Sequence, residues 1–435
     1  MKYLINNRIY IVFFIIITLD LFSCNQLENN LISFTDDEEI TTIYFDDEYE
    51  FLDAIDQLNK KGGTIYIDTP VISLNTKSSI SISGTIPGGI IGIRQSNGEY
   101  PRIKFTKKYY YYDDFLPGIN IYGSNKFIEY MIIENSPNYG ISIIGDNNIL
   151  DHVISRHNYG SGFNVFGNFN TLNYCYAYRN CYANKNSVNG DGFYIFGELN
   201  NIFNYCFAWD NANSGFNYAR TFNSSELSYL HSGSWNNGNV NVFTGKYDYD
   251  NGNSLDKNLW TIQEIMDSDP NFVSNYYNKK FNIDDAYLDR STVKEWIAKI
   301  NPKLDGNGFT FGNKDSSQSI DVKRNALYCV SFDHKSGGFI DNFNHRYNAF
   351  VTNCASFNNG VNYNLPYIFS KWINNWSWGS KNDDQLNEGI ITNKPTNTNR
   401  AQRLIYTVRD QIIQAVSANM FPDSVNFDST INKIG

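Results

Sequence analysis

The sequence lacks the features that mark nucleic-acid-binding proteins and cysteine-based metal sites. Its formal net charge is -10, with 35 Lys and Arg against 45 Asp and Glu, whereas a nucleic-acid interface needs a basic surface. It has six cysteines in 435 residues, and none of them form a Cys-x-x-Cys pair. We therefore expect no nucleic-acid partner and no cysteine-bound metal.

The chain also lacks an apolar run long enough to predict a transmembrane helix. The run IYIVFFIIITLDLF, which follows a short basic start, is interrupted by Asp20 and is shorter than a spanning helix requires. Such a start, with a small residue before Cys24, indicates an export signal over residues 1–24. The tetrapeptide LFSC resembles the lipobox of bacterial lipoproteins. This resemblance implies that Cys24 is the lipidated first residue of the mature chain and that residues 25–40 form a polar tether. The alternative is a plain signal peptide with an incidental Cys.

Apolar and aromatic residues are abundant instead. The chain is 41% hydrophobic, 16% aromatic and 18% charged, a balance that supports a large core and argues against long disordered stretches. Its length suits one large domain or two or three ordinary ones.

A phrase of the form Gly-Phe-x-apolar recurs along the chain at steps of about two dozen residues. A unit this short, made of three β-like pieces and Asn- and Gly-rich turns, does not bury its own apolar face, and stacking such units buries a continuous core. The repeat therefore predicts an all-β fold, a parallel β-helix forming a single domain over residues 41–435. The repeated units begin at Gly118, Gly140, Gly162, Gly192, Gly215, Gly308 and Gly338.

The two ends of the repeat region are expected to carry helices. The segment DDEYEFLDAIDQLNKKGG predicts an amphipathic helix that stops at Gly62-Gly63 and covers the open end of the solenoid. The segment RAQRLIYTVRDQIIQAV has helical spacing within a C-terminal helical tail at about 366–435, expected on the flank or end of the barrel. Residues 239–304 break the repeat and contain two capping-box-like starts, which predicts a helical insertion.

Successive side chains of a β-strand point to opposite faces of the sheet, so the direction of each side chain in the Gly-Phe-x-apolar phrase is predictable. The Phe residues are expected to point inward and the residues after them outward. If the insertion is skipped, the coil carrying Asn217 stacks directly on the coil carrying Thr310, about 5 Å away. With Asp191, Asn213 and Ser214 at the preceding turns, these side chains should cluster on one outer surface.

Four cysteines fall in one register of the repeat. We expect them to form an interior column of small core residues rather than disulfide bridges. Asn residues at the turns tolerate left-handed backbone angles and are able to form amide ladders along the stack. The four cysteines are Cys175, Cys206, Cys329 and Cys354.

Residues 118–364 resemble the polysaccharide lyases of family 9, a pectate-lyase-like group. The segments NGDGFYIFGELNNIFNYCFAWDNANSGFN, DGNGFTFG and NCASFNNGVNYN are similar to that family's Asp-Gly-Phe, Asn-Gly-Phe-Lys-Leu-Gly and closing-coil segments. The resemblance implies a right-handed parallel β-helix that cleaves uronic-acid-containing polysaccharide by β-elimination. In this family Ca²⁺ held by several Asp acidifies a C–H bond, and a Lys removes the proton.

The resemblance assigns a role to each residue of the predicted cluster. Asp191 occupies the position of the first calcium-binding Asp, and Asn213, Ser214 and Asn217 occupy three more such positions. Thr310 occupies the position of the proton-abstracting Lys. One carboxylate of four remains, and Ca²⁺ affinity depends on ligand charge. A Thr hydroxyl does not act alone as a general base near neutral pH.

Nearby loops offer other candidates for a base and for substrate binding. Lys314 is an alternative candidate for the catalytic base. Lys335 is a candidate for substrate binding, and the neighbouring His334 is a further candidate for the base. Arg220 is a candidate to face an anionic sugar, or else to pair with Glu226. For each of these side chains, ordinary solvation at the surface is the competing interpretation.

Three functions remain open from the sequence. The first is an exported lyase, either anchored at the bacterial surface or outer membrane or released outside the cell. It would act through altered calcium ligands or through a base at a different position. The second is a non-catalytic glycan-binding lipoprotein. Its aromatic platforms would be Tyr194, Trp209, Trp235 and the segment KWINNWSWGS at 371–380, unless these rings pack internally. The third is a hydrolase on the same scaffold. The expected partner is an acidic polysaccharide, and the cofactor implied by the resemblance is Ca²⁺. We expect the protein to be a monomer. The hydrolase would draw its carboxylates from Asp210, Asp333 and Asp341.

Overall fold

The computed structural model describes most of the unit Glu39–Gly435. The export signal, Cys24 and nearly all of the tether lie outside the described residues. Within these residues, no helix is long and apolar enough to cross a membrane. The described ranges are 39–75, 79–106, 118–136, 139–158, 160–180, 190–196, 199–211, 213–218, 226–238, 247–248, 253–254, 306–312, 323–341, 348–366, 372–387, 390–422 and 424–434.

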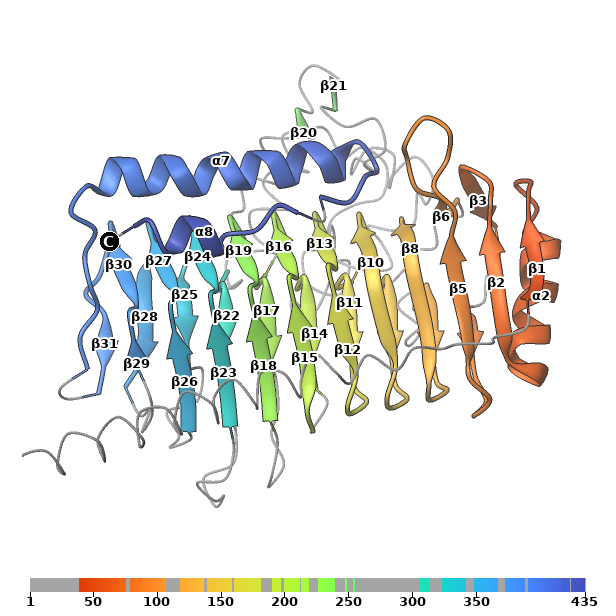
Figure 1. Cartoon of the computed structure of the whole chain (residues 1–435), viewed down its shortest axis with the longest axis horizontal. Coiled ribbons are helices and arrows are strands. Elements are labelled where there is room, and N and C mark those ends of the chain that lie inside the picture. Colours follow the sequence, from red (N-terminus) through yellow and green to blue (C-terminus); the bar gives the residue numbers. More distant parts are fainter. Residues whose placement is uncertain are drawn as a thin grey trace, which may run out of the picture. The chain divides into compact units, whose positions relative to one another are not determined.

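Short parallel strands stack into successive coils, which confirms the predicted β-helix (Figure 1). One face is a sheet of ten described strands that carries the Gly-Phe phrases, with each strand paired to the equivalent strand of the next coil. Its strands are β4 (Ile80–Ile82), β7 (Ile119–Ile121), β9 (Ile141–Ile143), β11 (Phe163–Val165), β14 (Phe193–Ile195), β17 (Phe216–Tyr218), β22 (Phe309–Thr310), β25 (Gly337–Ile340), β28 (Val361–Leu365) and β31 (Gln385–Leu386).

The other described strands of the stack form two further ladders, which join because β8 and β10 are long enough to belong to both. The first ladder is β1 (Glu39–Ile43), β2 (Gly63–Ile67), β5 (Gly88–Gly92), β8 (Lys126–Glu134), β10 (Ile149–Arg156), β12 (Thr171–Asn173), β15 (Asn201–Asn204), β18 (Glu226–Leu230), β23 (Lys323–Leu327), β26 (Asn348–Thr352) and β29 (Trp372–Ile373). The second adds β3 (Val71–Leu74), β6 (Arg102–Phe105), β13 (Tyr176–Tyr178), β16 (Phe207–Trp209), β19 (Gly233–Trp235), β24 (Val330–Phe332), β27 (Ala355–Phe357) and β30 (Trp376–Trp378).

The Phe residues of the repeated phrase form a continuous stack inside the barrel, as the alternation predicted. Consecutive ring centroids are 4.6–5.1 Å apart and the rings are nearly parallel. The Gly before each Phe is required by close packing. A Cβ on Gly308 would lie 1.9 Å from Ser331 Oγ, and one on Gly215 would lie 2.0 Å from Ser234 Oγ. The stacked rings are Phe163, Phe193, Phe216, Phe309, Phe339 and Tyr363.

The four cysteines in the repeat register are buried and unbridged, which confirms the predicted column. Each thiol lies near a carbonyl oxygen of its own turn, as in the 3.3 Å contact from Cys175 Sγ to Asn173 O. Burial raises the pKa of the Cys175 and Cys329 thiols well above the usual value. Cys175 and Cys329 are therefore packing residues rather than reactive thiolates.

The N-terminal helix also forms as predicted. Helix α2 (Glu48–Lys61) begins at Asp47, whose carboxylate accepts the Tyr49 and Glu50 amides, and ends at Gly62 with φ +73°. Its apolar stripe joins the barrel core. The residues of this stripe are Phe51, Ala54, Ile55 and Leu58.

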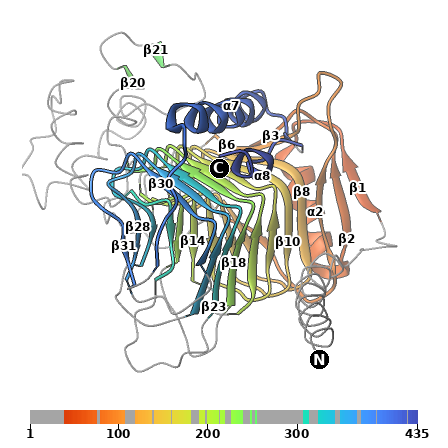
Figure 2. The ribbon, with the colours of Figure 1, turned by 60° about the vertical axis from the view of Figure 1, so that its left-hand side comes forward.

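The C-terminal tail differs from its predicted extent. The tail was expected to be helical from about residue 366, but the stack continues through β31, and helix α7 covers only Thr398–Ser417. The Trp-rich coil continues the earlier register, since Trp376 and Trp378 pair with the strand before them. Helix α7 and the short helix α8 (Asp428–Ile431) lie along the flank of the barrel, over the second ladder (Figure 2).

The helical insertion expected at 239–304 lies almost wholly outside the described residues. Its described strands β20 (Tyr247–Asp248) and β21 (Asn253–Ser254) form a short antiparallel pair rather than a helix. The insertion leaves and rejoins the stack at one point, because a Cβ on Gly238 would lie 2.1 Å from Gly306 Cα. The coils on either side of the insertion therefore pack directly on each other.

Candidate functional site

The cluster predicted around Asp191 forms in the structure. Phe216 in β17 pairs with Phe309 in β22, so the coil before the insertion meets the coil after it. Thr310 Oγ1 donates to Asn217 Oδ1 at 3.3 Å. Skipping the insertion therefore predicted the correct neighbour.

The Asp191 carboxylate is the acceptor at the centre of this cluster. Its Oδ1 accepts hydrogen bonds from Asn213 Nδ2 at 2.8 Å and from the Ser214 amide at 2.9 Å. Its Oδ2 accepts a hydrogen bond from Asn217 Nδ2 at 3.0 Å. A buried carboxylate is stable when donors such as these surround it. Asp191 has no solvent-exposed area, so the network satisfies a buried charge.

Thr310 lies on the outer side of its strand but is not open to solvent. The side chain is fully buried, and its hydroxyl accepts a hydrogen bond from the Tyr218 amide at 2.8 Å. Alternation correctly gave the direction of the side chain. The predicted open surface is wrong for Thr310, Asp191 and Ser214, because they are buried. Asn213 and Asn217 alone in the cluster keep partial exposure.

The residues of the Asp191 cluster do not fit a calcium site. Ca²⁺ takes six to eight oxygen ligands and favours several carboxylates. Among the described residues of the cluster, Asp191 is the only carboxylate, and both Asn213 and Asn217 turn their NH₂ groups toward it rather than presenting oxygens to a shared centre. Among the described residues, no group of three or more His, Cys, Asp or Glu is placed to hold a metal.

Two candidates from the sequence, Arg220 and Lys314, lie outside the described residues. Lys335 is described and exposed, and it lines a separate cleft together with His334. His334 is buried, and burial lowers its pKa to about 3. Its Nδ1 accepts the Asn237 amide and its Nε2 donates to Ser234 O. His334 is therefore uncharged, and it occupies a turn position at which neighbouring coils carry an Asn of the hydrogen-bonded amide ladder.

The separate cleft has a volume of about 660 Å³ and lies between helix α7 and one corner of the coils. Asp210, Asn236, Asp333 and Asn358 occupy this corner in successive coils, each with a left-handed φ between 54° and 57°. Asn and Asp adopt this conformation more readily than most residues. The corner therefore presents a column of polar side chains toward α7.

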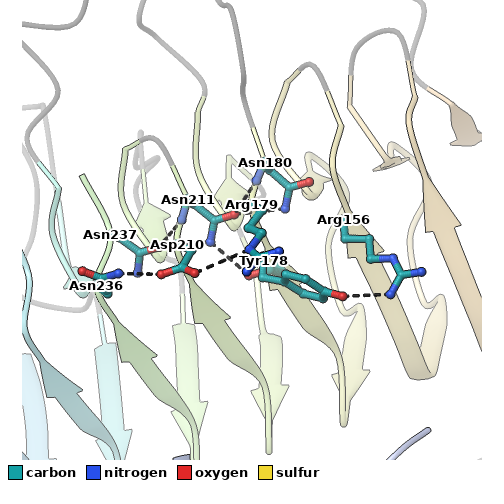
Figure 3. Close-up of polar contacts among 9 residues, drawn as sticks. Arg156, Tyr178, Arg179, Asn180, Asp210, Asn211, Asn236 and Asn237 are labelled. Carbon is teal, nitrogen blue, oxygen red and sulfur yellow. Dashed lines mark hydrogen bonds and ion pairs between the residues drawn. The ribbon is translucent and has the colours of Figure 1, made fainter. Parts of the chain in front are cut away.

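The two carboxylates of the column are held by different partners. Asp210 accepts a hydrogen bond from Asn236 Nδ2 at 2.6 Å and lies 3.6 Å from Arg179 Nε (Figure 3). Asp333 accepts a hydrogen bond from the Tyr406 hydroxyl at 2.8 Å, and burial raises the Asp333 pKa despite that bond. The third proposed hydrolytic carboxylate, Asp341, is not among the residues that line the cleft.

Positive charge also surrounds this cleft. Lys335 and Lys381 are exposed, and both line it. Arg409 from α7 lies 4.2 Å above the Tyr406 ring and pairs with Asp410 at 2.7 Å. Neither Lys381 nor Arg409 could be identified from the sequence, because their place in the cleft depends on where α7 packs. The shared turn register of Asp210 and Asp333 was the one available clue.

The aromatic residues considered as glycan platforms are mostly packed. Trp209, Trp235 and Trp378 are at most 5% exposed. They belong to a second stack of rings with centroids 4.5–5.6 Å apart, in one apolar cluster with α7 and α8. A ring inside such a stack has no free face for a sugar. Tyr194 is partly exposed.

The fold matches known proteins with low sequence identity. Residues 37–255, about half of the chain, match the family described as "Pel9A-like, right handed beta helix region". The crystal structure of pectate lyase Pel9A aligns with a TM-score of 0.52 and 17% identity, covering 80% of this chain and 74% of that chain. A rhamnogalacturonan lyase aligns with a TM-score of 0.46 and 14% identity, over 79% of this chain and 82% of that one. No curated protein matches the sequence.

Proposed function

The chain belongs to the Pel9A-like right-handed β-helix family. On this premise we propose that the protein binds acidic polysaccharide. We propose also that the Asp191 cluster does not catalyse cleavage of that polysaccharide. A structure similar to this chain is named pectate lyase Pel9A. This name supports a uronic-acid-containing polymer as the proposed ligand. We propose further that the protein is exported and held at the cell surface through lipid on Cys24.

The hydrogen bonds to Asp191 are the observation that carries this proposal. In the lyases of family 9, several carboxylates hold Ca²⁺ and a Lys removes the proton. In this chain, Asn213, Ser214 and Asn217 donate hydrogen bonds to the one remaining carboxylate. The hydroxyl of Thr310 accepts a backbone amide where the family has its base. The cluster thus supplies neither the charge to bind the cation nor a base near neutral pH.

The proposal is tested by measuring binding and cleavage in parallel. Polygalacturonate embedded in a native gel should retard the purified protein, and a neutral galactan should not. Incubation with the same polymer and Ca²⁺ should give no unsaturated products that absorb in the ultraviolet. Calcium-dependent unsaturated products would instead establish β-elimination, and no retardation by any acidic polysaccharide would refute binding.

Hydrolysis is the second candidate function, because Asp210 and Asp333 line one cleft. They are separated by two coils, about 10 Å of backbone along the stack. This exceeds the ~5–5.5 Å of a retaining pair and is close to the upper limit of an inverting pair. Hydrolysis predicts new reducing ends without unsaturation, abolished in Asp333→Asn and kept in Asp341→Asn. Wild-type protein that releases no reducing ends excludes it.

A further inference from the structure

We propose that the cleft beneath α7 is the binding site for the polysaccharide, with Lys381 and Arg409 binding uronate carboxylates and Asp210 and Asp333 accepting sugar hydroxyls. This inference rests on the proposed function and assigns it a location. It moves ligand binding from the buried Asp191 cluster to another surface of the same solenoid.

The charges in the cleft suit a ligand that carries both carboxylates and hydroxyls. Three cationic side chains and three carboxylates line it together. A densely charged polyanion would be repelled by the acidic groups, and a neutral sugar would form no charge-assisted hydrogen bond with the cations. A uronate unit has one carboxylate and several hydroxyl donors, so it matches both sets. The cations are Lys335, Lys381 and Arg409, and the carboxylates are Asp210, Asp333 and Asp410.

The carboxylates are oriented to accept hydrogen bonds. Asn236 fixes Asp210, and Asn358 and Tyr406 fix Asp333. An ionised carboxylate accepts about four hydrogen bonds, and Asp333 meets two donor groups, so it retains capacity for sugar hydroxyls. Because these side chains are already held in place, binding a sugar costs little conformational entropy.

Trp235 supplies an independent indication of a ligand. It lines the cleft and is 2% exposed. In the part of the chain that the structure describes, its indole Nε1–H has no hydrogen-bond partner. A buried donor without an acceptor is uncommon in native proteins. An acceptor atom supplied by a bound molecule would satisfy it.

The cleft has the length of an oligosaccharide site. Its lining spans five successive coils, whose strands pair from Trp209 through Trp235, Phe332 and Phe357 to Trp378. Four steps between coils correspond to about 19 Å along the stack. The volume of about 660 Å³ lies within the range of ligand sites. Helix α7 runs lengthwise over this flank (Figure 1), so a chain lying along the axis would contact several coils.

The test compares the full-length protein with two double variants that each lose two positive charges. Lys381→Ala/Arg409→Ala removes two cations of the cleft. The control, Lys60→Ala/Lys61→Ala, removes two exposed cations in the last turn of α2. Affinity for oligogalacturonate is measured by calorimetry at fixed salt, and circular dichroism on heating checks that each variant is folded. We expect the cleft variant to lose affinity by about tenfold or more, since two charge-assisted bonds are removed.

Each outcome separates the inference from the proposed function. Weaker binding in the cleft variant with unchanged binding in the α2 control supports the inference. Equal affinity in both variants overturns the inference and leaves polysaccharide binding intact. An equal loss in both variants also overturns it, because the attraction would then be general charge. A wild-type protein that binds no acidic glycan overturns the proposed function itself.

Discussion

The Asp191 cluster and the cleft beneath α7 are two polar regions of one solenoid with opposite designs. In the Asp191 cluster, the carboxylate, Ser214 and Thr310 are buried, and their hydrogen bonds are made within the chain. In the cleft, cationic and acidic side chains line an open volume. The first arrangement stabilises the stack, and the second leaves groups available to a ligand.

This contrast shows that a place on the outer face of a β-helix does not by itself make a binding surface. Thr310 points outward and is still completely buried. Asp191 keeps the carboxylate of a metal ligand but meets hydrogen-bond donors. Changes in the cluster should therefore affect stability, and changes in the cleft should affect binding.

The largest expected effect is that of Asp191→Ala on stability. It leaves the donors of Asn213, Ser214 and Asn217 without their buried acceptor, and we expect a loss of about 3 kcal/mol in the free energy of unfolding. Urea denaturation measures it, with the exposed Asp383→Ala as the control, expected within about 0.5 kcal/mol of wild type. Unchanged stability in Asp191→Ala would show that the network is not structural.

The second effect is acid destabilisation through His334. Burial lowers the folded-state pKa to about 3, below the ordinary value near 6.5, so protons bind the unfolded chain more readily. The contribution of neutral His334 to the free energy of unfolding is fully present above pH 6.5 and is lost as the pH falls toward 3. We expect the free energy of unfolding to fall by about 2 kcal/mol between pH 7 and 5. His334→Asn restores the residue found at Asn237 and Asn359 and should flatten this part of the profile. An identical pH profile in wild type and variant, measured by urea denaturation, would contradict the assignment.

A smaller effect is expected at Thr310. Thr310→Val keeps the shape but removes the acceptor of the Tyr218 amide, at a cost of about 1 to 2 kcal/mol. Thr310→Ser keeps the hydroxyl and is the matched variant, expected closer to wild type. Thermal unfolding distinguishes them, and equal destabilisation of both would show that packing rather than the hydrogen bond matters.

The smallest expected change in stability is that of Lys381→Ala. The side chain is exposed, so the free energy of unfolding should change by less than about 0.5 kcal/mol. Affinity for oligogalacturonate should nevertheless fall several-fold, which calorimetry measures. A Lys381→Ala variant that loses stability but keeps its affinity would show that Lys381 has a structural role rather than a role in binding.

Much of the fold was predictable because a solenoid repeats local patterns. The Gly-Phe phrase predicted the ring stack, the cysteine register predicted the buried column, and Asn217 and Thr310 were correctly paired across the insertion. Each of these follows from alternation along a strand and stacking of equivalent positions.

The burial of the predicted site and the position of the cleft were not predictable in the same way. Burial of Thr310 depends on what packs over the outer face, and the cleft depends on where α7 lies against the coils. The sequence placed α7 on the flank or end without fixing its depth or register, so Arg409 and Lys381 gave no signal. Tyr130 and His152 show a related limit, since they adopt left-handed backbone angles within β8 and β10, a conformation that we expected of Asn residues at turns. Their ring stacking, with centroids 4.7 Å apart, stabilises that conformation.

Calcium titration of the full-length protein by calorimetry tests the central claim most directly. If the Asp191 carboxylate is satisfied by hydrogen bonds from its own chain, Ca²⁺ should give no saturable binding at micromolar concentrations and should not change thermal stability. Tight binding of Ca²⁺ that disappears in Asp191→Ala would contradict the account and would restore the cluster as a metal site.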